Sequence, residues 1–405
     1  MWEFFVVIIS FLSIPLLNKK KIQIGIAICI CAALMAFLGG LGLSDIKEVI
    51  FSTFFDITKV ERYIVVLEIG ILGVLLKEYK IIDEVIRYIV AVIKNKKIVL
   101  MSIPALVGLL SVPGGAIISV PFVDKLGDES NLSSNQKAIV NLIYRHIAMH
   151  ILPYTIGFLV VTSLLPQISI YKFIGLNFIF VILYVTIGYF LYLRKVENNN
   201  ILSANPVLPN LLKLLIYTAP VYLAVFLNMF FHIPFYIGII ANLLVIYFLR
   251  PKKTFLWDIA RAFNIRILLA LIGVYLIQGV IGKMESISSL LSLIFNNPQT
   301  IMLGIIFTSF FFGLTTGFQP TALGVVLPIL ITLPISESQL LLYCHFTFMW
   351  SFIGYFFSPL HLCQLFTCEY LKISTIDLYK DYWKFFLYLV ALLIIDYLIL
   401  GLLLK

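Results

Sequence analysis

An arginine and two histidines lie inside one long apolar stretch of this chain, within the string NLIYRHIAMHILPY. A charged side chain in apolar surroundings costs ~2.5 kcal/mol or more, so Arg145 is expected to line a cavity or to have a partner. Asn141 lies four residues earlier and shares its helix face. The two side chains could hold an anionic group. The alternative is a structural contact of Arg145 with a backbone carbonyl, or a side chain that extends to the membrane interface.

His146 and His150 are also four residues apart and could relay protons, make structural hydrogen bonds or bind a metal ion. No Glu follows His146, so the zinc-protease pattern HExxH is absent, and we predict no metal site. His345 and His361 flank the proline in a second apolar string, CHFTFMWSFIGYFFSPLHLC. Ser358 and His361 lie where that proline should unwind the helix. A role in a binding site and a purely structural role are equally favoured for these residues.

Two apolar stretches, 98–126 and 300–333, are interrupted by Gly and Pro near their middles. The first contains GLLSVPGGAIISVP and the second GLTTGFQPTALGVVLP, and in each string two prolines lie eight residues apart. A further proline follows each stretch, Pro153 and Pro359, at separations of 32 and 31 residues. Interrupted helices leave backbone groups without partners, which hydrocarbon tolerates only where protein or a watery cavity covers them. The interruptions therefore indicate a buried polar site.

The interrupted stretches carry small and hydroxyl side chains at their centres. Gly allows a ligand to approach the backbone closely, and carbonyl, amide and hydroxyl oxygens suit an alkali cation; helix packing by small residues is the alternative. The residues concerned are Ser111, Pro113, Gly114, Gly115, Thr315, Thr316, Gln319 and Thr321. Glu68, in an earlier apolar run, could carry protons. Asp396, in the last run, is expected to make an interfacial or oligomer contact.

The composition excludes a soluble enzyme, a disordered chain and a disulfide scaffold. Of the 405 residues, 61% are apolar and only 12% are charged, against about 25% charged in an ordinary soluble domain. The five cysteines lie in apolar segments and are interpreted as small buried hydrophobic residues. The first run, Trp2 to Leu17, has no basic start or small-residue cleavage site, so it is expected to be a retained span.

Apolar runs predict an all-α polytopic membrane protein with about ten spans at ~20 residues each. An amphipathic segment precedes each interrupted stretch, at 78–94 and 284–296. The chain is expected to divide into a first repeat, 1–195, a cytoplasmic linker, 196–210, and a second repeat, 211–405. The predicted spans are 2–17, 22–43, 62–77, 137–165, 172–193, 211–231, 235–249, 265–281, 339–371 and 383–404. The stretches 98–126 and 300–333 are expected to be re-entrant hairpins, which enter and leave the membrane on one side.

Lys and Arg predict the orientation. With the N-terminus outside, 22 of the 29 basic residues fall in inside segments and 6 in outside segments, as the positive-inside rule requires. The formal charge of +9 is therefore attributed to topology and not to nucleic-acid binding. We expect a multi-pass protein of the cytoplasmic (inner) membrane with both termini outside. Because each half has five crossings, the second repeat is inverted relative to the first, a pattern typical of secondary transporters.

The strings GLLSVPGGA, NLIYRH and SPLHLC resemble those of an uncharacterised prokaryotic membrane family grouped with the ion transporter superfamily, and the layout of the whole chain is similar to that superfamily. The superfamily includes dicarboxylate/sodium symporters, gluconate and citrate permeases, and arsenite antiporters. The resemblance implies an elevator-like homodimer with hairpin tips at Ser111 to Ala116 and Thr315 to Thr321. It places the unwound breaks at Pro153 to Thr155 and Ser358 to His361. The dicarboxylate symporters carry Ser-Asn-Thr at both tips, where this chain has SVPGG and TGFQPT.

We therefore predict a secondary active transporter, not an enzyme, that moves a small anionic solute by alternating access and is driven by a sodium or proton gradient. No cofactor is expected beyond a bound sodium ion. The alternatives are an intramembrane enzyme that uses His146, His150, His345 and His361, or an ion channel. The predicted solute site comprises Ser111, Pro113, Gly114, Gly115, Asn141, Arg145, Thr315, Thr316, Gln319, Thr321, Ser358 and His361. The predicted ion-coupling residues are Glu68, His146, Thr155 and His345.

Overall fold

The chain is helical throughout the part that the computed structural model describes, which comprises residues 2–109, 116–197, 207–284, 300–331 and 333–403. No strand occurs within these ranges. Several helices combine length with apolar composition, as a bilayer-spanning helix must. Five of them are long enough to cross a membrane: Ser134–Leu164, Ile170–Leu193, Val207–Phe231, Ile265–Gly282 and Thr375–Leu402. The chain is therefore a polytopic helical membrane protein.

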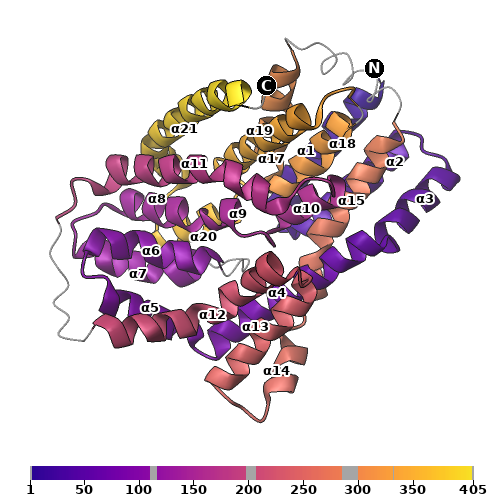
Figure 1. Ribbon diagram of the computed structural model, residues 1–405. Helices are drawn as coiled ribbons and strands as arrows, with labels where there is room; N and C mark the ends of the chain where they lie inside the picture. Colours follow the sequence, from indigo (N-terminus) through magenta and orange to yellow (C-terminus); the bar gives the residue numbers. More distant parts are fainter. Residues whose placement is uncertain (1, 110–115, 198–206, 285–299, 332, 404–405) are drawn as a thin grey trace.

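The first part of the chain forms the helices on the indigo-to-magenta side of the colour scale in Figure 1. They are α1 (Trp2–Lys19), α2 (Ile24–Leu38), α3 (Leu43–Phe54), α4 (Ile57–Glu78), α5 (Ile81–Val92), α6 (Lys96–Leu109), α7 (Ala116–Asp128), α8 (Ser134–Arg145), α9 (Ala148–Ile151), α10 (Ile156–Leu164) and α11 (Ile170–Gly188). A π-helical turn, Tyr189–Leu193, continues α11.

The second part follows a similar order. Its helices are α12 (Val207–Phe231), α13 (Phe235–Leu249), α14 (Phe255–Ala262), α15 (Leu268–Gly282), α17 (Ile301–Thr316), α18 (Gln319–Ile331), α19 (Glu337–Phe356), α20 (Leu362–Leu371) and α21 (Thr375–Leu403). A 3₁₀ turn, Ile265–Ile267, leads into α15. In both parts a helix pair, α6–α7 or α17–α18, is followed by a broken helix and then by a long unbroken helix.

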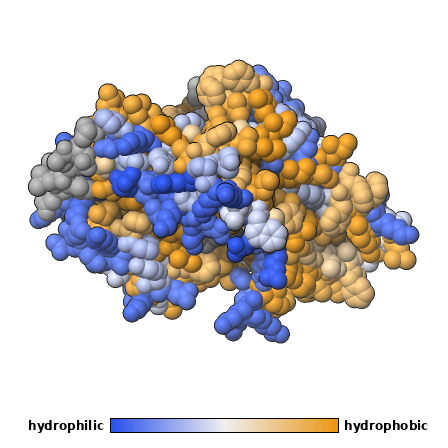
Figure 2. Space-filling model, turned by 90° about the horizontal axis from the view of Figure 1, so that it is seen from below, coloured by the Kyte–Doolittle hydropathy of each residue, from blue (hydrophilic) through white to orange (hydrophobic). Residues whose placement is uncertain are grey.

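Large apolar side chains remain exposed over much of the surface. Phe37 is 80% exposed and Phe248 is 76% exposed, and Figure 2 shows apolar residues over much of one face beside a group of polar ones. A contiguous apolar surface of this kind marks contact with a membrane or another protein. Together with the long apolar helices, it places the chain in a lipid bilayer.

Equivalent signals start the two broken helices. Ser133 caps α8 and exchanges hydrogen bonds with Gln136 in a capping box. Ser336 and Gln339 form the same motif at the start of α19. A capping box satisfies two backbone donors that a helix otherwise leaves open. The two helices therefore begin at positions fixed by the same local chemistry.

The two parts of the chain pack against each other in a reciprocal way. α2 packs on α15, and their counterparts by order, α13 and α4, also pack together. α10 contacts α18, and the counterparts α20 and α7 are in contact too. In Figure 1 the short helices α9 and α20 lie between the helix pair α6–α7 and the pair α17–α18. Each helix pair therefore packs on the short arm of the other part's broken helix.

Several predicted boundaries differ from the observed ones. The span predicted at 62–77 begins earlier, at Ile57, because Asp56 accepts a hydrogen bond from the Lys59 amide and caps the helix. The amphipathic helices α3 and α14 were not predicted, whereas the segment predicted at 78–94 forms α5. Most of the second amphipathic segment, 284–296, and of the linker, 196–210, lies outside the described residues.

Candidate functional site

Two helix breaks form the centre of the candidate site. α9 ends at Ile151 and α10 starts after Thr155, so the break predicted at Pro153 to Thr155 is confirmed. α19 ends at Phe356 and α20 starts after His361, which confirms the break at Ser358 to His361. A further interruption at His146 and Ile147 separates α8 from α9. Each break leaves the first N–H groups of a new helix without intrahelical partners.

Glycines allow each helix pair to approach its broken helix. A side chain on Gly108 of α6 would overlap the carbonyl oxygen of Arg145 at the end of α8. On the other side, Gly313 of α17 lies against the backbone of α19 at Ser351, and Gly354 of α19 lies against Phe310 of α17. Backbones this close leave no space for a Cβ atom. The breaks are therefore held by backbone contact with the helix pairs.

The turn between α17 and α18 is anchored on the second break. Gly317 has a positive φ of 61°, which glycine adopts without strain, and its added Cβ would lie 2.8 Å from Leu360 Cβ. Ser358 Oγ donates a 2.6 Å hydrogen bond to the Leu314 carbonyl. Thr315 and Thr316 donate to carbonyls of their own helix, at Phe311 and Phe312. In this structure both threonine hydroxyls are therefore engaged with the backbone near the end of α17.

The starts of α10 and α18 lie together. Gln319, the first residue of α18, places its Oε1 atom 3.2 Å from the position of a Cβ on Gly157 of α10. Its Nε2 atom donates to the Phe348 carbonyl at 3.0 Å. Within the described part of the chain, three buried oxygens on these two helix starts have no hydrogen-bond partner: Thr155 Oγ1, Gln319 Oε1 and Thr321 Oγ1. Buried polar atoms without partners are costly, so these oxygens are candidates for ligand contact.

Asn141 joins three helices in this structure. Its Oδ1 atom accepts a 2.6 Å hydrogen bond from Ser119 of α7, and its Nδ2 atom donates to Thr367 Oγ1 of α20 at 3.0 Å. Asn141 is fully buried. It therefore fixes α7, α8 and α20 relative to one another beside the second break.

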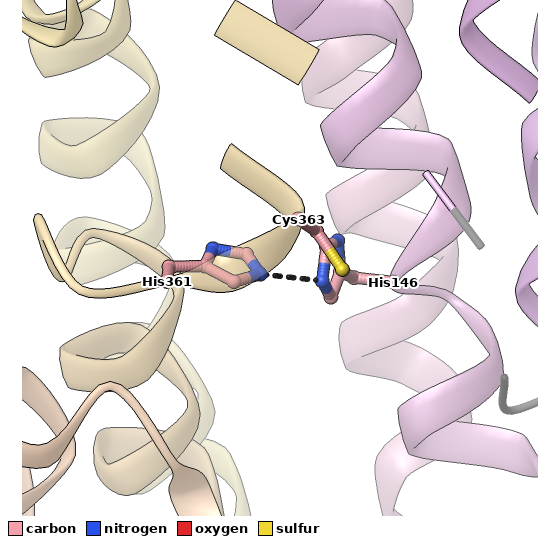
Figure 3. Close-up of side chains that lie close together, drawn as sticks. All are labelled: His146, His361 and Cys363. Atoms are coloured by element: carbon pink, nitrogen blue, oxygen red, sulfur yellow. Dashed lines mark hydrogen bonds between the residues drawn. The ribbon is translucent and has the colours of Figure 1, made fainter. Parts of the chain in front are cut away.

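A histidine–histidine–cysteine cluster joins the interruption at His146 to the second break at Ser358 to His361 (Figure 3). His146 Nε2 and His361 Nε2 lie 3.0 Å apart, and the Cys363 Sγ atom lies within 4.8 Å of the ligand nitrogens of both rings. The hydroxyl of Tyr355 lies 3.3 Å from His146 Nε2. Arg145, the last residue of α8 and the one directly before His146, is also buried. Residues 215 positions apart in the chain thus share one site.

A second buried histidine lies on α19, ahead of the break. His345 Nε2 and Asp396 Oδ2 are 2.8 Å apart, and His345 Nδ1 lies 3.0 Å from Asn177 Oδ1. His345 is fully buried and Asp396 is 4% exposed. The expectation that Asp396 makes an interfacial or oligomer contact is therefore wrong, because its carboxylate is buried against an imidazole.

The remaining predicted residues are separate from these clusters. Both ring nitrogens of His150 are buried without a hydrogen-bond partner among the described residues, and the Phe352 ring centroid lies 4.3 Å from that of His150. Glu68, on α4, has one buried carboxylate oxygen that no described residue hydrogen-bonds. The predicted tip residues Ser111, Pro113, Gly114 and Gly115 lie outside the described residues.

Sequence reasoning missed Cys363, Tyr355 and Asn177. The spacing His361-x-Cys363, directly after a helix-breaking proline, was a signal for Cys363, because it brings two metal-ligating side chains to one helix start. Tyr355 and Asn177 carried no such signal, since each depends on a partner distant in the chain.

None of the curated proteins matches this sequence at a significant level. One family model matches residues 4–403, which is nearly the whole helical chain. The chain therefore belongs to the family described as "Protein of unknown function (DUF401)".

Proposed function

We propose that this chain is a secondary active transporter for a small anionic solute. The observation that carries the proposal is the contact between the starts of α10 and α18, which together carry three unpartnered buried oxygens. Helix starts carry partial positive charge and free N–H groups, which suit an anion. Interrupted helices that pair inside a membrane are typical of transporter sites.

The proposed architecture is an inverted repeat of two five-span halves with re-entrant hairpins α6–α7 and α17–α18. The matching helix order, the shared capping boxes of α8 and α19 and the reciprocal contacts between halves support it. Helices α17 and α18 have 16 and 13 residues. At 1.5 Å per residue each is shorter than the ~30 Å hydrocarbon core. Hairpins of this length can enter and leave on one side, and the basic residues favour the orientation with both termini outside.

Access to the proposed site requires movement. Gln319 and Thr321 are at most 1% exposed, and Thr155 is 8% exposed. A solute can therefore reach these oxygens only when the hairpins and short helices move relative to the rest of the protein. Alternating access of an elevator-like, dimeric protein meets this requirement.

Two features are candidates for ion coupling. The oxygens of Thr155, Gln319 and Thr321 form a hard-oxygen set that could bind sodium together with the solute. Alternatively, His345 and Asp396 share a buried hydrogen bond and could carry a proton. Arg145 supplies a buried positive charge beside the second break and is the proposed anion clamp.

The first experiment measures ligand binding by the purified protein. Thermal unfolding is followed with a panel of organic anions, each with and without sodium, because a ligand that binds the folded state raises apparent stability. We expect at least one anion to raise the unfolding temperature, and a sodium-dependent shift would identify the coupling ion. Anions that give no shift at any pH, with or without sodium, would contradict the proposal.

The second experiment locates the site and separates the rival functions. In proteoliposomes, Thr321→Val should weaken solute uptake about 3- to 10-fold in KM, the value of one hydrogen bond. Thr315→Val is the matched control, since its hydroxyl donates only to its own helix, and it should leave uptake unchanged. Arg145→Ala should reduce anion affinity; full transport in that variant would remove the anion clamp. Flux that does not saturate would favour a channel, and chemical turnover of the solute would favour an enzyme.

A further inference from the structure

The two imidazoles of the histidine–histidine–cysteine cluster are held by backbone oxygens. His146 Nδ1 lies 2.6 Å from the Leu142 carbonyl oxygen, and His361 Nδ1 lies 3.1 Å from the Phe356 carbonyl oxygen. Carbonyl oxygens only accept hydrogen bonds, so each Nδ1 atom must donate. In the neutral rings the proton is therefore on Nδ1, and both Nε2 atoms present lone pairs.

These two lone pairs face each other. The Nε2 atoms are 3.0 Å apart, and two acceptors at that distance repel unless a positive species lies between them. The Tyr355 hydroxyl can donate to only one of them, at 3.3 Å. Imidazoles whose Nδ1–H is fixed by a carbonyl and whose Nε2 is free are typical metal ligands.

Cys363 supplies a third donor from a different position. It lies in the first turn of α20, for which His361 is the N-cap residue, and helix starts favour a thiolate. In a tetrahedral zinc site, Zn–N bonds of 2.0–2.1 Å and a Zn–S bond near 2.3 Å place ligand atoms about 3.3–3.6 Å apart. The nitrogens are 3.0 Å apart and all three ligand atoms lie within 4.8 Å of one another, so the side chains must shift toward this geometry when a metal ion binds.

We propose that His146, His361 and Cys363 form a binding site for a soft, closed-shell metal ion, Zn²⁺ or Cu⁺. Two imidazoles and one thiolate are the donors that such ions prefer. Three protein ligands complete a trigonal site for Cu⁺ or leave a fourth position of Zn²⁺ for water or an anionic ligand. Arg145, a buried residue that directly precedes His146 in the chain, adds a positive charge beside this ligand. The site goes beyond the transporter proposal and does not depend on it.

The test uses the full-length purified protein, stripped of metal with a chelator. Zn²⁺ and Cu⁺ are titrated against chromophoric competitors, and Co²⁺ is used as a spectroscopic probe for the zinc arm. We expect one ion per chain and, with Co²⁺, an absorption band that reports thiolate ligation. Tight binding in either the zinc or the copper arm supports the site. The proposal would be overturned if neither ion bound at one per chain. That result would mean that the two histidines share only a proton.

Matched variants locate the site. Cys363→Ser should remove the thiolate band, and His361→Gln should weaken binding about 100-fold or more, beyond the effect typical of outer-sphere partners. Cys368→Ser and His150→Gln are the controls, because Cys368 is a buried cysteine of the same helix and His150 a buried histidine, both outside the cluster. Equal binding by Cys363→Ser and Cys368→Ser would show adventitious metal only.

A measurement on the unaltered protein avoids variants that fail to fold. Cys29 and Cys363 are the two partly exposed cysteines, so a small alkylating reagent provides an internal comparison by mass spectrometry. Zn²⁺ or Cu⁺ should slow alkylation of Cys363 at least about 10-fold and leave Cys29 unchanged. Equal protection of both cysteines, or of neither, would contradict the proposal.

Discussion

His345 and His361 are both fully buried, yet the hydrogen-bonding groups around their ring nitrogens differ. Asn177 Oδ1 accepts from His345 Nδ1, and the Asn177 amide is oriented because its Nδ2 donates to the His150 carbonyl. The other ring nitrogen faces Asp396. One proton between that nitrogen and the carboxylate satisfies both groups, whichever atom carries it.

His361 has no carboxylate partner among the described residues. Its neighbours are a second imidazole and a thiol. With both Nδ1 protons directed at backbone carbonyls, neither neutral ring places a proton between the two Nε2 atoms. At His345, one shared proton satisfies both partners, whereas at His361 this tautomer leaves two nitrogen lone pairs face to face, an arrangement that a bound cation would stabilise. Similar burial of the same residue type thus supports a structural or proton-carrying role in one place and metal binding in the other.

The sharpest way to break this comparison is to remove the carboxylate. Asp396→Ala should destabilise the protein by about 3–5 kcal/mol, the usual cost of leaving one partner of a buried pair alone. Asp396→Asn should cost less, because its amide can still donate to His345. The measurement is the midpoint of thermal unfolding in detergent.

Glu48→Ala is the control for that experiment. Glu48 pairs with Lys283 at 2.6 Å but is 68% exposed on its side chain, so its loss should cost at most about 1 kcal/mol. Equal unfolding midpoints for Asp396→Ala and Glu48→Ala would mean that the buried pair contributes no more than a surface one.

A smaller effect should separate the two sites from each other. A methyl group in Gly108→Ala would overlap the Arg145 carbonyl and cost about 1–3 kcal/mol by overpacking. The added methyl group should also displace His146, which directly follows Arg145, and so weaken metal binding. His345 and Asp396 should stay in place. Unfolding midpoints and Zn²⁺ titration check both parts.

Gly175→Ala is the matched control, since the added methyl group on α11 would have no described atom within 4 Å other than those of the adjacent backbone of its own helix. It should change stability by no more than about 1 kcal/mol, because alanine favours a helix. If Gly108→Ala binds Zn²⁺ as tightly as Gly175→Ala does, backbone contact with α6 does not position His146.

The smallest expected effect concerns the carboxylate of Asp258, which lies outside the spans and is hydrogen-bonded to a tyrosine, whereas that of Asp396 is buried against an imidazole. The Tyr79 hydroxyl donates a 2.7 Å hydrogen bond to Asp258 and holds the pKa of that carboxyl below its ordinary value. A lowered folded-state pKa contributes stability above the ordinary Asp pKa of about 3.9, and this is lost as pH falls through the folded-state value.

Tyr79→Phe should therefore lower stability slightly at neutral pH, and the difference from the unaltered protein should shrink as the pH falls below about 4. Unfolding midpoints measured across the acidic range test this. A difference that stays constant with pH would assign the effect of Tyr79 to packing alone.

Much of the fold was predictable because its signals are local. Apolar runs of about 20 residues identify spans, and Pro153 and Pro359 mark both breaks because proline lacks the amide hydrogen that a helix interior needs. The amphipathic helices α3 and α14 were not predicted, because short segments of mixed polar and apolar residues lack the length that identifies a span. The start of α4 moved because of a cap at Asp56 that hydropathy does not detect.

The candidate site was only partly predictable. Arg145, His146 and His361 stood out as polar residues in apolar runs, but their partners depend on which helices meet. His146 was considered with His150, four residues away, whereas it lies against His361 and Cys363. Spacing along one helix shows which side chains share a face, and it says nothing about the face that packs opposite.

The sequence by itself determined that this is a helical membrane protein with two Pro-interrupted regions, because hydrophobicity and proline act locally. Only the tertiary structure decided which interrupted helix starts meet, that Asp396 pairs with His345, and that two imidazoles and a thiol share one site. Those outcomes depend on contacts between residues as many as 215 positions apart, which packing of the two halves of the chain brings together.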